Sequence, residues 1–215
     1  MKIGVLGTGI VGNTLGTKLV ALGHNVKMGS RTTNNQKASE WVRTNGSKAS
    51  QGTFAEAASF GEVVFNCTPG SVSLEALKAA GEQNLHDKIL VDVSNPLDFS
   101  KGFPPVLTTS NTDSVGEKIQ RAFPQAKVVK TLNTVSSTIM VNPSLVPGDH
   151  DIFMSGNDSA AKNQVREILT KWFGWKSVID LGDISNARGQ EMYLPLWVRL
   201  FRLYQNPNFN IKIVK

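Results

Sequence analysis

The segment KIGVLGTGIVG, residues 2–12, carries the clearest indication of the fold of this chain. Its apolar beginning predicts a short buried strand over residues 2–6. The pattern G-x-G-x-x-G follows at once, and its glycines are Gly7, Gly9 and Gly12. Apolar residues then recur at helical spacing until Gly23, which predicts the end of a helix. A glycine triplet between a strand and a helix is typical of a dinucleotide-binding fold, and a purely structural strand-to-helix turn is the alternative.

The glycine loop predicts a phosphate site for physical reasons. The first glycine allows a tight turn, the second lets a pyrophosphate approach the backbone, and the third lets the helix pack on the strand. The N-terminus of the helix adds free N–H groups and a partial positive charge. We therefore expect the cofactor to contact Gly7, Thr8, Gly9, Ile10, Val11 and Gly12.

The segment GSRTT, residues 29–33, follows a second predicted strand at residues 25–28. In this architecture the end of the second strand meets the adenosine ribose, where many chains carry one acidic residue. This chain instead has Ser30, Arg31 and Thr32. A guanidinium binds a phosphate through two charge-assisted hydrogen bonds, and the hydroxyls add donors. The segment therefore predicts a site for the 2′-phosphate of NADP, with a solvated loop arginine as the alternative.

Composition narrows the class of protein. The 215 residues are 40% hydrophobic and 19% charged, which is ordinary for a soluble globular protein of one compact domain or a domain with a small appendage. No apolar run approaches a membrane span, so no membrane partner is expected. The single cysteine, Cys67, excludes internal disulfides, suits a reducing cytoplasm and is expected to be a packing residue.

Charge and histidine content exclude two further classes. The formal net charge is +6, but the basic residues are scattered, so no nucleic-acid partner is expected. A mildly basic surface more simply attracts a polyanionic cofactor. The three histidines are far apart in the sequence, and no metal site is predicted.

Strands and helices alternate along the first two thirds of the chain. This alternation predicts an α/β fold, a doubly wound Rossmann-type parallel sheet with a small C-terminal α/β extension. We expect an NADP-binding Rossmann domain over residues 1–140 and the extension, packed on it, over residues 141–215. One continuous domain is the alternative.

The last third predicts four local features. Asn157 is expected to cap a helix, and a longer helix from about Asn186 is expected to kink at Pro195. The alternating apolar residues of NFNIKIVK, residues 208–215, predict a terminal strand. The aromatic-rich YLPLWVRLFRLY is expected in the core or at a subunit interface, so a homodimer stays open.

Small polar residues follow three of the later strands. Because ligands of open α/β sheets lie beyond the carboxyl ends of the strands, these loops are expected to border the nicotinamide half of the cofactor. The residues are Thr68, Pro69, Gly70, Ser94, Asn95, Pro96, Asn133 and Val135. Ordinary turn chemistry is the alternative for each. No catalytic side chain is predicted. Lys130, near the end of a predicted strand, is expected to be a solvated surface lysine, with a proton donor as the alternative.

Several motifs together carry a resemblance over essentially the whole chain. They are GTGIVGNTLGTKLVALGHNVKMGSR from residue 7, NCTPGSV from residue 66, LNTVSS from residue 132, MSGND from residue 154 and DLGDISNAR from residue 180. With them the chain resembles the NADPH-dependent oxidoreductases that reduce the deazaflavin coenzyme F420, and the related reductase domains of the STEAP metalloreductases. Members that use the deazaflavin often have a His-Thr-Ile-Pro-like stretch where this chain has Asn133, Thr134, Val135 and Ser136.

The resemblance implies a function for the predicted site. We expect an NADP-dependent oxidoreductase that transfers hydride between NADPH and a small-molecule redox acceptor, either a flavin or a deazaflavin. Ring-to-ring hydride transfer needs little acid–base help from side chains, because the cofactors carry the chemistry. The alternatives are a carbonyl or imine dehydrogenase on the same cofactor fold and a non-catalytic NADP-sensing module.

Overall fold

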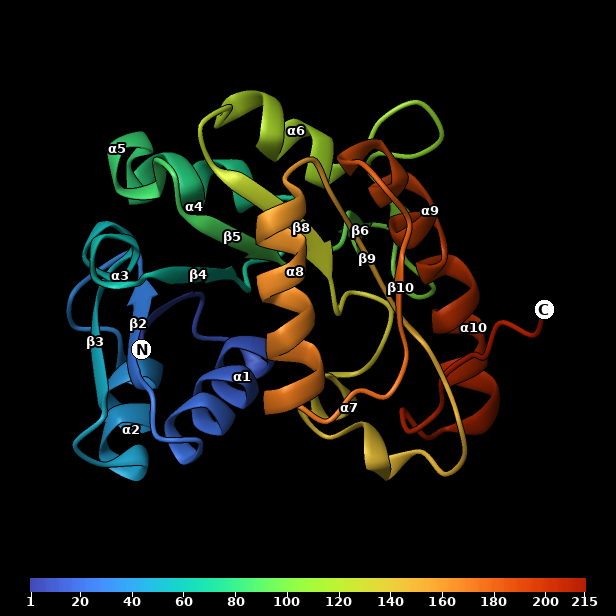
Figure 1. Cartoon of the computed structure of the whole chain (residues 1–215), viewed down its shortest axis with the longest axis horizontal. Coiled ribbons are helices and arrows are strands. Elements are labelled where there is room, and N and C mark those ends of the chain that lie inside the picture. Colours follow the sequence, from blue (N-terminus) through green and yellow to red (C-terminus); the bar gives the residue numbers. More distant parts are fainter.

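The computed structural model describes residues 1–215, and its centre is one eight-stranded sheet with the order β10-β9-β8-β5-β4-β1-β2-β3 (Figure 1). Six strands are parallel to one another: β1 (Lys2–Leu6), β2 (Asn25–Ser30), β3 (Ala49–Thr53), β4 (Val63–Asn66), β5 (Ile89–Asp92) and β8 (Lys127–Thr131). The remaining two are β9 (Ile152–Gly156), which is antiparallel to β8, and β10 (Val178–Asp180), which is parallel to β9. The α/β doubly wound architecture is confirmed, with one antiparallel step that the expected all-parallel sheet lacked.

Helices cover both faces of the sheet (Figure 1). On one face lie α1 (Ile10–Ala21), α2 (Gln36–Asn45), α7 (Ser137–Val141) and α8 (Ser159–Glu167), the last continued by a π-helical turn, η2 (Ile168–Trp172). On the other lie α3 (Phe54–Phe60), α4 (Ser73–Ala80), α5 (Glu82–Leu85) and α6 (Val115–Ala122). Two 3-10 turns, η1 (Pro143–Leu145) and η3 (Ile184–Asn186), and a small hairpin, β6 (Leu97–Asp98) with β7 (Val106–Leu107), complete the connections.

The C-terminal helices lie on the right of Figure 1, beside β9 and β10. They are α9 (Ala187–Met192) and α10 (Leu194–Tyr204). The helix is interrupted at Tyr193, and Pro195 stands in the first turn of α10, where its missing N–H costs nothing. The helix that was expected to run from about Asn186 with a kink at Pro195 is thus two helices, α9 and α10, which meet at Tyr193.

The two faces of the central strand β1 explain why the sheet is buried on both sides. Ile3 and Val5 belong to a core with Leu15 and Trp41 from the helices of one face, whereas Leu6 belongs to the core of the other face. Such a run of apolar residues is typical of a parallel strand covered by helices on both faces. The consequence for function is that only the ends of the strands are open to a ligand.

Two local expectations in the last third are wrong. Residues 208–215 form no strand, because Asp151 binds this segment through single contacts: its carboxylate accepts from Ile213 N (2.6 Å) and its N–H donates to Ile211 O (3.0 Å). Asn157 does not cap α8. Asp158 does so by accepting from Ala161 N, and the Asn157 side chain instead accepts from Ile184 N.

The strands β9 and β10 extend the same sheet as the first six strands. The division between residues 1–140 and 141–215 stays a prediction. None of the helices combines the length and the apolar character that a membrane crossing requires.

Candidate functional site

The candidate site is the edge of the sheet at which β1, β2, β4, β5 and β8 end. Because these strands are parallel, the loops that follow them all emerge at this edge. Hydrogen bonds tie the loops together: Gly70 N donates to Asn95 O (3.1 Å), and Asn95 Nδ2 donates to Asn133 O (2.9 Å). Residues that are distant in sequence are thus held as one surface.

The three glycines of the first loop have three distinct environments. Gly7 has a φ of +118°, a conformation that favours glycine. A Cβ on Gly12 would lie 2.1 Å from Gly7 O, so only glycine lets α1 pack this close to β1. A Cβ on Gly9 would meet no protein atom within 4 Å. Gly9 therefore borders open space, as expected for the position where a pyrophosphate approaches the backbone.

The N-terminus of α1 adds favourable electrostatics for an anion. Gly9 is the N-cap, no side chain caps the helix, and no acidic residue lies in the first turn. The first N–H groups of the helix and its partial positive charge therefore face the loop without a competing side chain. Ile10, 78% exposed, adds apolar surface beside them. This loop can hold the phosphates of a dinucleotide.

The segment after β2 divides into a buried and an exposed part. Ser30 is buried, and its hydroxyl donates to Thr32 O (2.6 Å), so it shapes the loop. Arg31 and Thr32 are exposed at the same edge of the sheet as the glycine loop. Gly7 N donates to Gly29 O (2.9 Å), which joins the two loops directly. The contacts of Ser30, Arg31 and Thr32 with a 2′-phosphate stay predictions.

The loop after β4 is held from below by buried polar side chains. Thr68 donates its hydroxyl to Asn66 Oδ1 (2.6 Å), and Asn66 Nδ2 donates to Asp92 Oδ1 (2.8 Å). A Cβ on Gly70 would lie 2.4 Å from Asn95 O, so the loops after β4 and β5 touch here. Thr68 thus positions the loop, while Pro69 is exposed above it.

Asn133 lies in the predicted place but with its side chain already engaged. It is 1% exposed, and Nδ2 donates to Asn95 Oδ1 (3.0 Å) and to Gln190 O (3.2 Å). In this state its amide ties protein loops together and does not extend toward a ligand. Val135 is also buried, two residues further along the same loop.

Two buried hydroxyls at this edge have no partner within the protein. They are Ser94 Oγ, after β5, and Thr134 Oγ1, after β8. Buried polar atoms are almost always hydrogen-bonded, so an unpaired pair on adjacent loops calls for an explanation. A bound polar group such as the carboxamide of a nicotinamide has the donors and the acceptor to satisfy both hydroxyls. With the open Gly9 and the uncapped α1, these residues fit a nicotinamide dinucleotide.

Lys130 is not the expected surface lysine. Its side chain is fully buried beneath the loops, and its ammonium contacts Asp92 Oδ2 (2.8 Å), Glu191 Oε1 (2.8 Å) and Ser94 O (2.6 Å). These three contacts use all three donors of the ammonium. Burial by itself would lower the pKa of Lys130, but the two carboxylates raise it above its ordinary value. Lys130 stays charged and sealed from solvent.

Sequence reasoning missed the polar layer under the site, which consists of Asn66, Asp92, Gln190 and Glu191 together with Lys130. One signal was available for part of it. Asp92 and Lys130 each interrupt an apolar strand near its end, and the two residues are direct partners in the register of β5 and β8. Opposite charges in adjacent buried strands are expected to pair. Gln190 and Glu191 carried no comparable local signal.

Cys67 follows β4 and agrees with the expected packing role. It is buried, and burial followed by the nearby Asp92 charge raises the pKa of its thiol. A thiol in this state is inert.

Comparisons with known proteins agree with this geometry. Residues 2–96 match the family described as NADP oxidoreductase, coenzyme F420-dependent. A solved structure of a candidate F420-dependent NADP reductase from Arthrobacter sp. FB24 is 49% identical, covers 100% of both chains and superposes with a TM-score of 0.94. A reductive aminase from Aspergillus terreus in complex with NADPH is 18% identical over 95% of this chain and 62% of its own, with a TM-score of 0.66, and shows the fold alone.

Curated relatives point the same way. The metalloreductase STEAP3 of Rattus norvegicus is 32% identical over 204 residues, and human STEAP2 is 29% identical over 216 residues. These matches cover 91% and 96% of this chain, but the chain spans only 38% of the length of either relative. The chain belongs to the NADP oxidoreductase family described as coenzyme F420-dependent, and it is an NADP-dependent oxidoreductase.

Proposed function

We propose that this protein transfers hydride between NADPH and a flat ring acceptor, a flavin or a deazaflavin such as coenzyme F420, at the edge formed by the five loops. Family membership supports the NADPH half of the proposal. The identity of the acceptor depends on whether a proton-donating side chain reaches this edge of the sheet.

The observation that carries the proposed acceptor is that the Lys130 ammonium is fully buried and fully hydrogen-bonded. A carbonyl reductase needs a proton donor beside the developing alkoxide. Lys130 is the lysine nearest in sequence to the loops after β5 and β8, and its three donors are all engaged by Asp92, Glu191 and Ser94 below these loops. Transfer between two redox rings needs no such donor, because the rings themselves carry the chemistry.

The chain then has three tasks in the proposed reaction. The glycine loop and the N-terminus of α1 bind the pyrophosphate, and Arg31 binds the 2′-phosphate. Ser94 and Thr134 orient the nicotinamide carboxamide, and with it one face of the ring. The loops after β5 and β8 keep water from that face. When bound, the nicotinamide supplies the hydride.

Turnover with a panel of acceptors tests the proposal. Purified protein is mixed with NADPH and, separately, with coenzyme F420, riboflavin, FMN, FAD and a set of small carbonyl compounds, while the nicotinamide absorbance is followed. Oxidation by at least one flavin or deazaflavin, with none by the carbonyl compounds, is expected. Rapid oxidation by a carbonyl compound alone would instead indicate a dehydrogenase, and tight NADPH binding without turnover would indicate a sensor.

One observation favours a carbonyl or imine reductase as the second candidate. The hydroxyl of Tyr193 is buried without a hydrogen-bond partner, and burial raises its pKa, so it keeps its proton. Tyr193 lies one helical turn beyond Gln190, which contacts Asn133 of the site. If Tyr193 is a proton donor, Tyr193→Phe will abolish carbonyl reduction. Our proposal expects Tyr193→Phe to leave reduction of a flavin or deazaflavin within about twofold of wild type.

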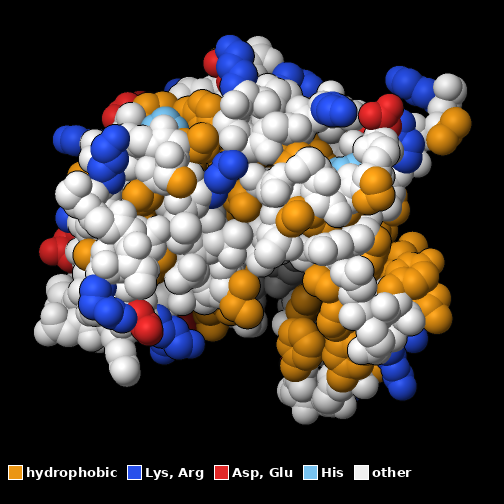
Figure 2. Space-filling view, turned by 90° about the horizontal axis from the view of Figure 1, so that it is seen from below, with side chains coloured by type: hydrophobic (Ala, Val, Ile, Leu, Met, Phe, Trp, Pro, Cys, Tyr) orange, Lys and Arg blue, Asp and Glu red, His pale blue; other side chains and the backbone are white.

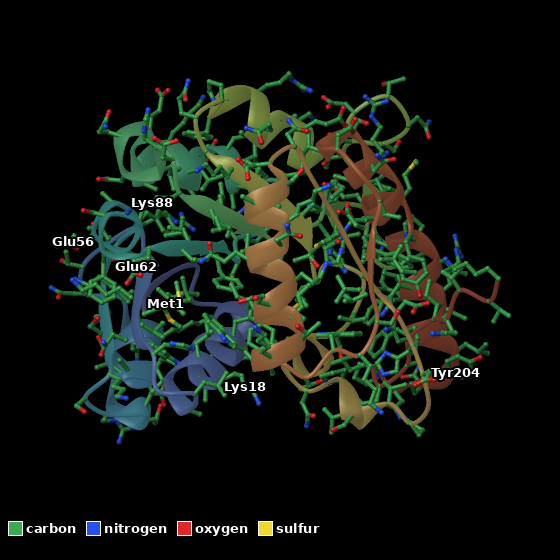
Figure 3. The ribbon with its side chains drawn as sticks, viewed as in Figure 1. Met1, Lys18, Glu56, Glu62, Lys88 and Tyr204 are labelled. Carbon is green, nitrogen blue, oxygen red and sulfur yellow. The ribbon has the colours of Figure 1, made fainter.

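We also propose a homodimer formed through α10. Leu196, Leu203 and Tyr204 are 53%, 71% and 59% exposed on this helix, and Tyr204 lies at the outer end of the molecule (Figure 3). Figure 2 shows hydrophobic side chains gathered on the side of the molecule that bears the C-terminal end. Apolar patches of this kind mark interaction surfaces. Sedimentation should give a dimer for wild type and a monomer for Leu203→Lys, and a monomeric wild type would contradict this.

The proposed location is the cytoplasm. The one cysteine is a free thiol, which suits a reducing compartment.

A further inference from the structure

The loop after β8 is fastened to the C-terminal helix α9 by one side chain. The Gln190 carboxamide is 2% exposed, and its Nε2 lies 3.4 Å from Asn133 Oδ1, 3.3 Å from Lys130 O and 3.3 Å from Phe153 O. Its Oε1 accepts the Ser155 hydroxyl (2.6 Å), which fixes the orientation of the amide. Gln190 therefore joins α9 to β8, to β9 and to the site loop at once.

Gln190 contacts the site through Asn133 from two directions. Asn133 Oδ1 faces Gln190 Nε2, and Asn133 Nδ2 donates to Gln190 O (3.2 Å). The same Asn133 exchanges two hydrogen bonds with Asn95, one from each side-chain amide (2.9 and 3.0 Å). Hydrogen bonds thus run from Gln190 to Asn133 and from Asn133 to Asn95. The positions of the loops after β5 and β8, which carry Ser94 and Thr134, depend on this series of amide contacts.

The next residue of α9, Glu191, fixes the position of the helix that carries Gln190. Glu191 accepts from Lys130 Nζ and from the N–H groups of Val115 (2.8 Å) and Gly116 (3.1 Å) at the start of α6. Because α9 is fastened on that side by a fully buried ion pair, Gln190 has little freedom to follow the loop. It holds the loop in place.

We propose that Gln190 is a positioning residue for the nicotinamide half of the cofactor: it acts through Asn133 to hold the loops after β5 and β8 at a fixed separation, and it contributes nothing to binding of the adenosine half. This inference rests on the proposed function, in which NADP lies along the same edge with its phosphates at the glycine loop.

The test compares two ligands that share the adenosine half. NADP⁺ carries the nicotinamide, whereas adenosine 2′,5′-bisphosphate lacks it, and both are titrated calorimetrically into wild type and Gln190→Met. Methionine keeps most of the buried volume but has no amide. We expect NADP⁺ to bind about tenfold more weakly to the variant, which corresponds to about 1.4 kcal/mol and lies within the range for one hydrogen bond. The bisphosphate should bind within about twofold of wild type.

Two further variants keep the test decisive. Gln190→Ala should show the same split if the methionine side chain prevents folding. Gln120→Ala is the matched control, because Gln120 Nε2 likewise donates to two backbone carbonyls, of Phe123 (3.2 Å) and Ala126 (2.9 Å), but on α6 away from the loops. It should leave both affinities unchanged.

The possible outcomes distinguish the positioning role of Gln190 from the proposed function. Equal weakening of both ligands, or weakening of neither, in folded Gln190 variants would overturn the positioning role alone. Failure of wild type to bind either ligand would overturn the proposed function, and the inference with it.

Discussion

The ammonium of Lys130 lies 2.8 Å from a carboxylate oxygen of Glu191, and neither side chain is more than 1% exposed. Asp92 Oδ2, on the neighbouring strand β5, lies 2.8 Å from the same ammonium. Two carboxylates and one ammonium leave one negative charge in excess, and the start of α6 compensates for it, because its N–H groups donate to Glu191. This cluster joins β5, β8, α6 and α9 directly beneath the proposed nicotinamide site.

Replacing Lys130 by methionine should destabilise the protein strongly. The substitution keeps the length of the side chain but leaves two buried carboxylates without their cation, a change that typically costs about 3–5 kcal/mol of unfolding free energy. Urea unfolding followed by circular dichroism measures it. Lys127→Met on the same strand is the control, because Lys127 is only half-buried and forms no ion pair, and its cost should be below about 1 kcal/mol. Equal costs for the two variants would show that the cluster contributes no stability.

The same cluster predicts how stability depends on pH. The pKa of Lys130 is raised in the folded protein, so its contribution is complete below the ordinary lysine pKa of about 10.4 and is lost as pH rises through the higher folded value. The unfolding free energy of wild type should therefore fall through this alkaline range more steeply than that of Lys130→Met. Parallel curves for the two proteins would contradict the assignment.

Cofactor choice should depend on Arg31. Arg31 is exposed in the loop after β2, at the same edge of the sheet as the glycine loop. One charge-assisted hydrogen bond contributes about 1.5–3 kcal/mol, or roughly 10–150-fold in affinity. Arg31→Ala should lose the preference for NADPH while its affinity for NADH stays nearly constant. Titration of both cofactors into wild type and variant measures this. If wild type binds NADH as tightly as NADPH, residues 29–33 do not bind the 2′-phosphate as proposed.

The glycine loop offers a contrast between binding and folding. Gly9 has an ordinary extended backbone and open space around its Cα, so Gly9→Val should fold like wild type and yet lose NADPH binding, because the side chain occupies the pyrophosphate position. Gly12→Val places its Cβ against Gly7 O and should lower stability as well. Melting temperature and NADPH titration separate the two effects. Retained NADPH affinity in Gly9→Val would assign the loop a purely structural role.

The parts of the fold that sequence predicted well are those fixed by local signals. The strand β1, the glycine loop and the helix α1 are contiguous in the sequence, so neighbouring residues are enough to predict all three. The failures depend on distant partners. The terminal segment has the alternation of a strand, yet the N–H of Ile213 donates to the Asp151 carboxylate and not to a neighbouring strand.

In the candidate site, too, local sequence predicts some features, whereas others depend on residues that are distant in the sequence. Loop positions follow from strand ends, so the sequence alone places the loops along this edge of the sheet. It does not predict the state of Lys130, because the burial of that lysine depends on Asp92 and on Glu191, which come from separate parts of the chain. The engagement of Asn133 by Gln190 likewise follows from the docking of α9, for which the sequence carries no short-range signal.

Hydride transfer from NADPH to a deazaflavin can be followed with an isotope label. NADPH that carries deuterium at both C4 positions of the nicotinamide is incubated with the protein and coenzyme F420, and the reduced product is examined by mass spectrometry. A deazaflavin has a carbon where a flavin has a ring nitrogen, so a transferred deuterium stays bound and does not exchange with water. We expect wild type, but not Gly9→Val, to form a product one mass unit heavier than that from unlabelled NADPH. Unlabelled coenzyme F420 recovered unreduced, together with deuterium transfer to a small carbonyl compound, would contradict it.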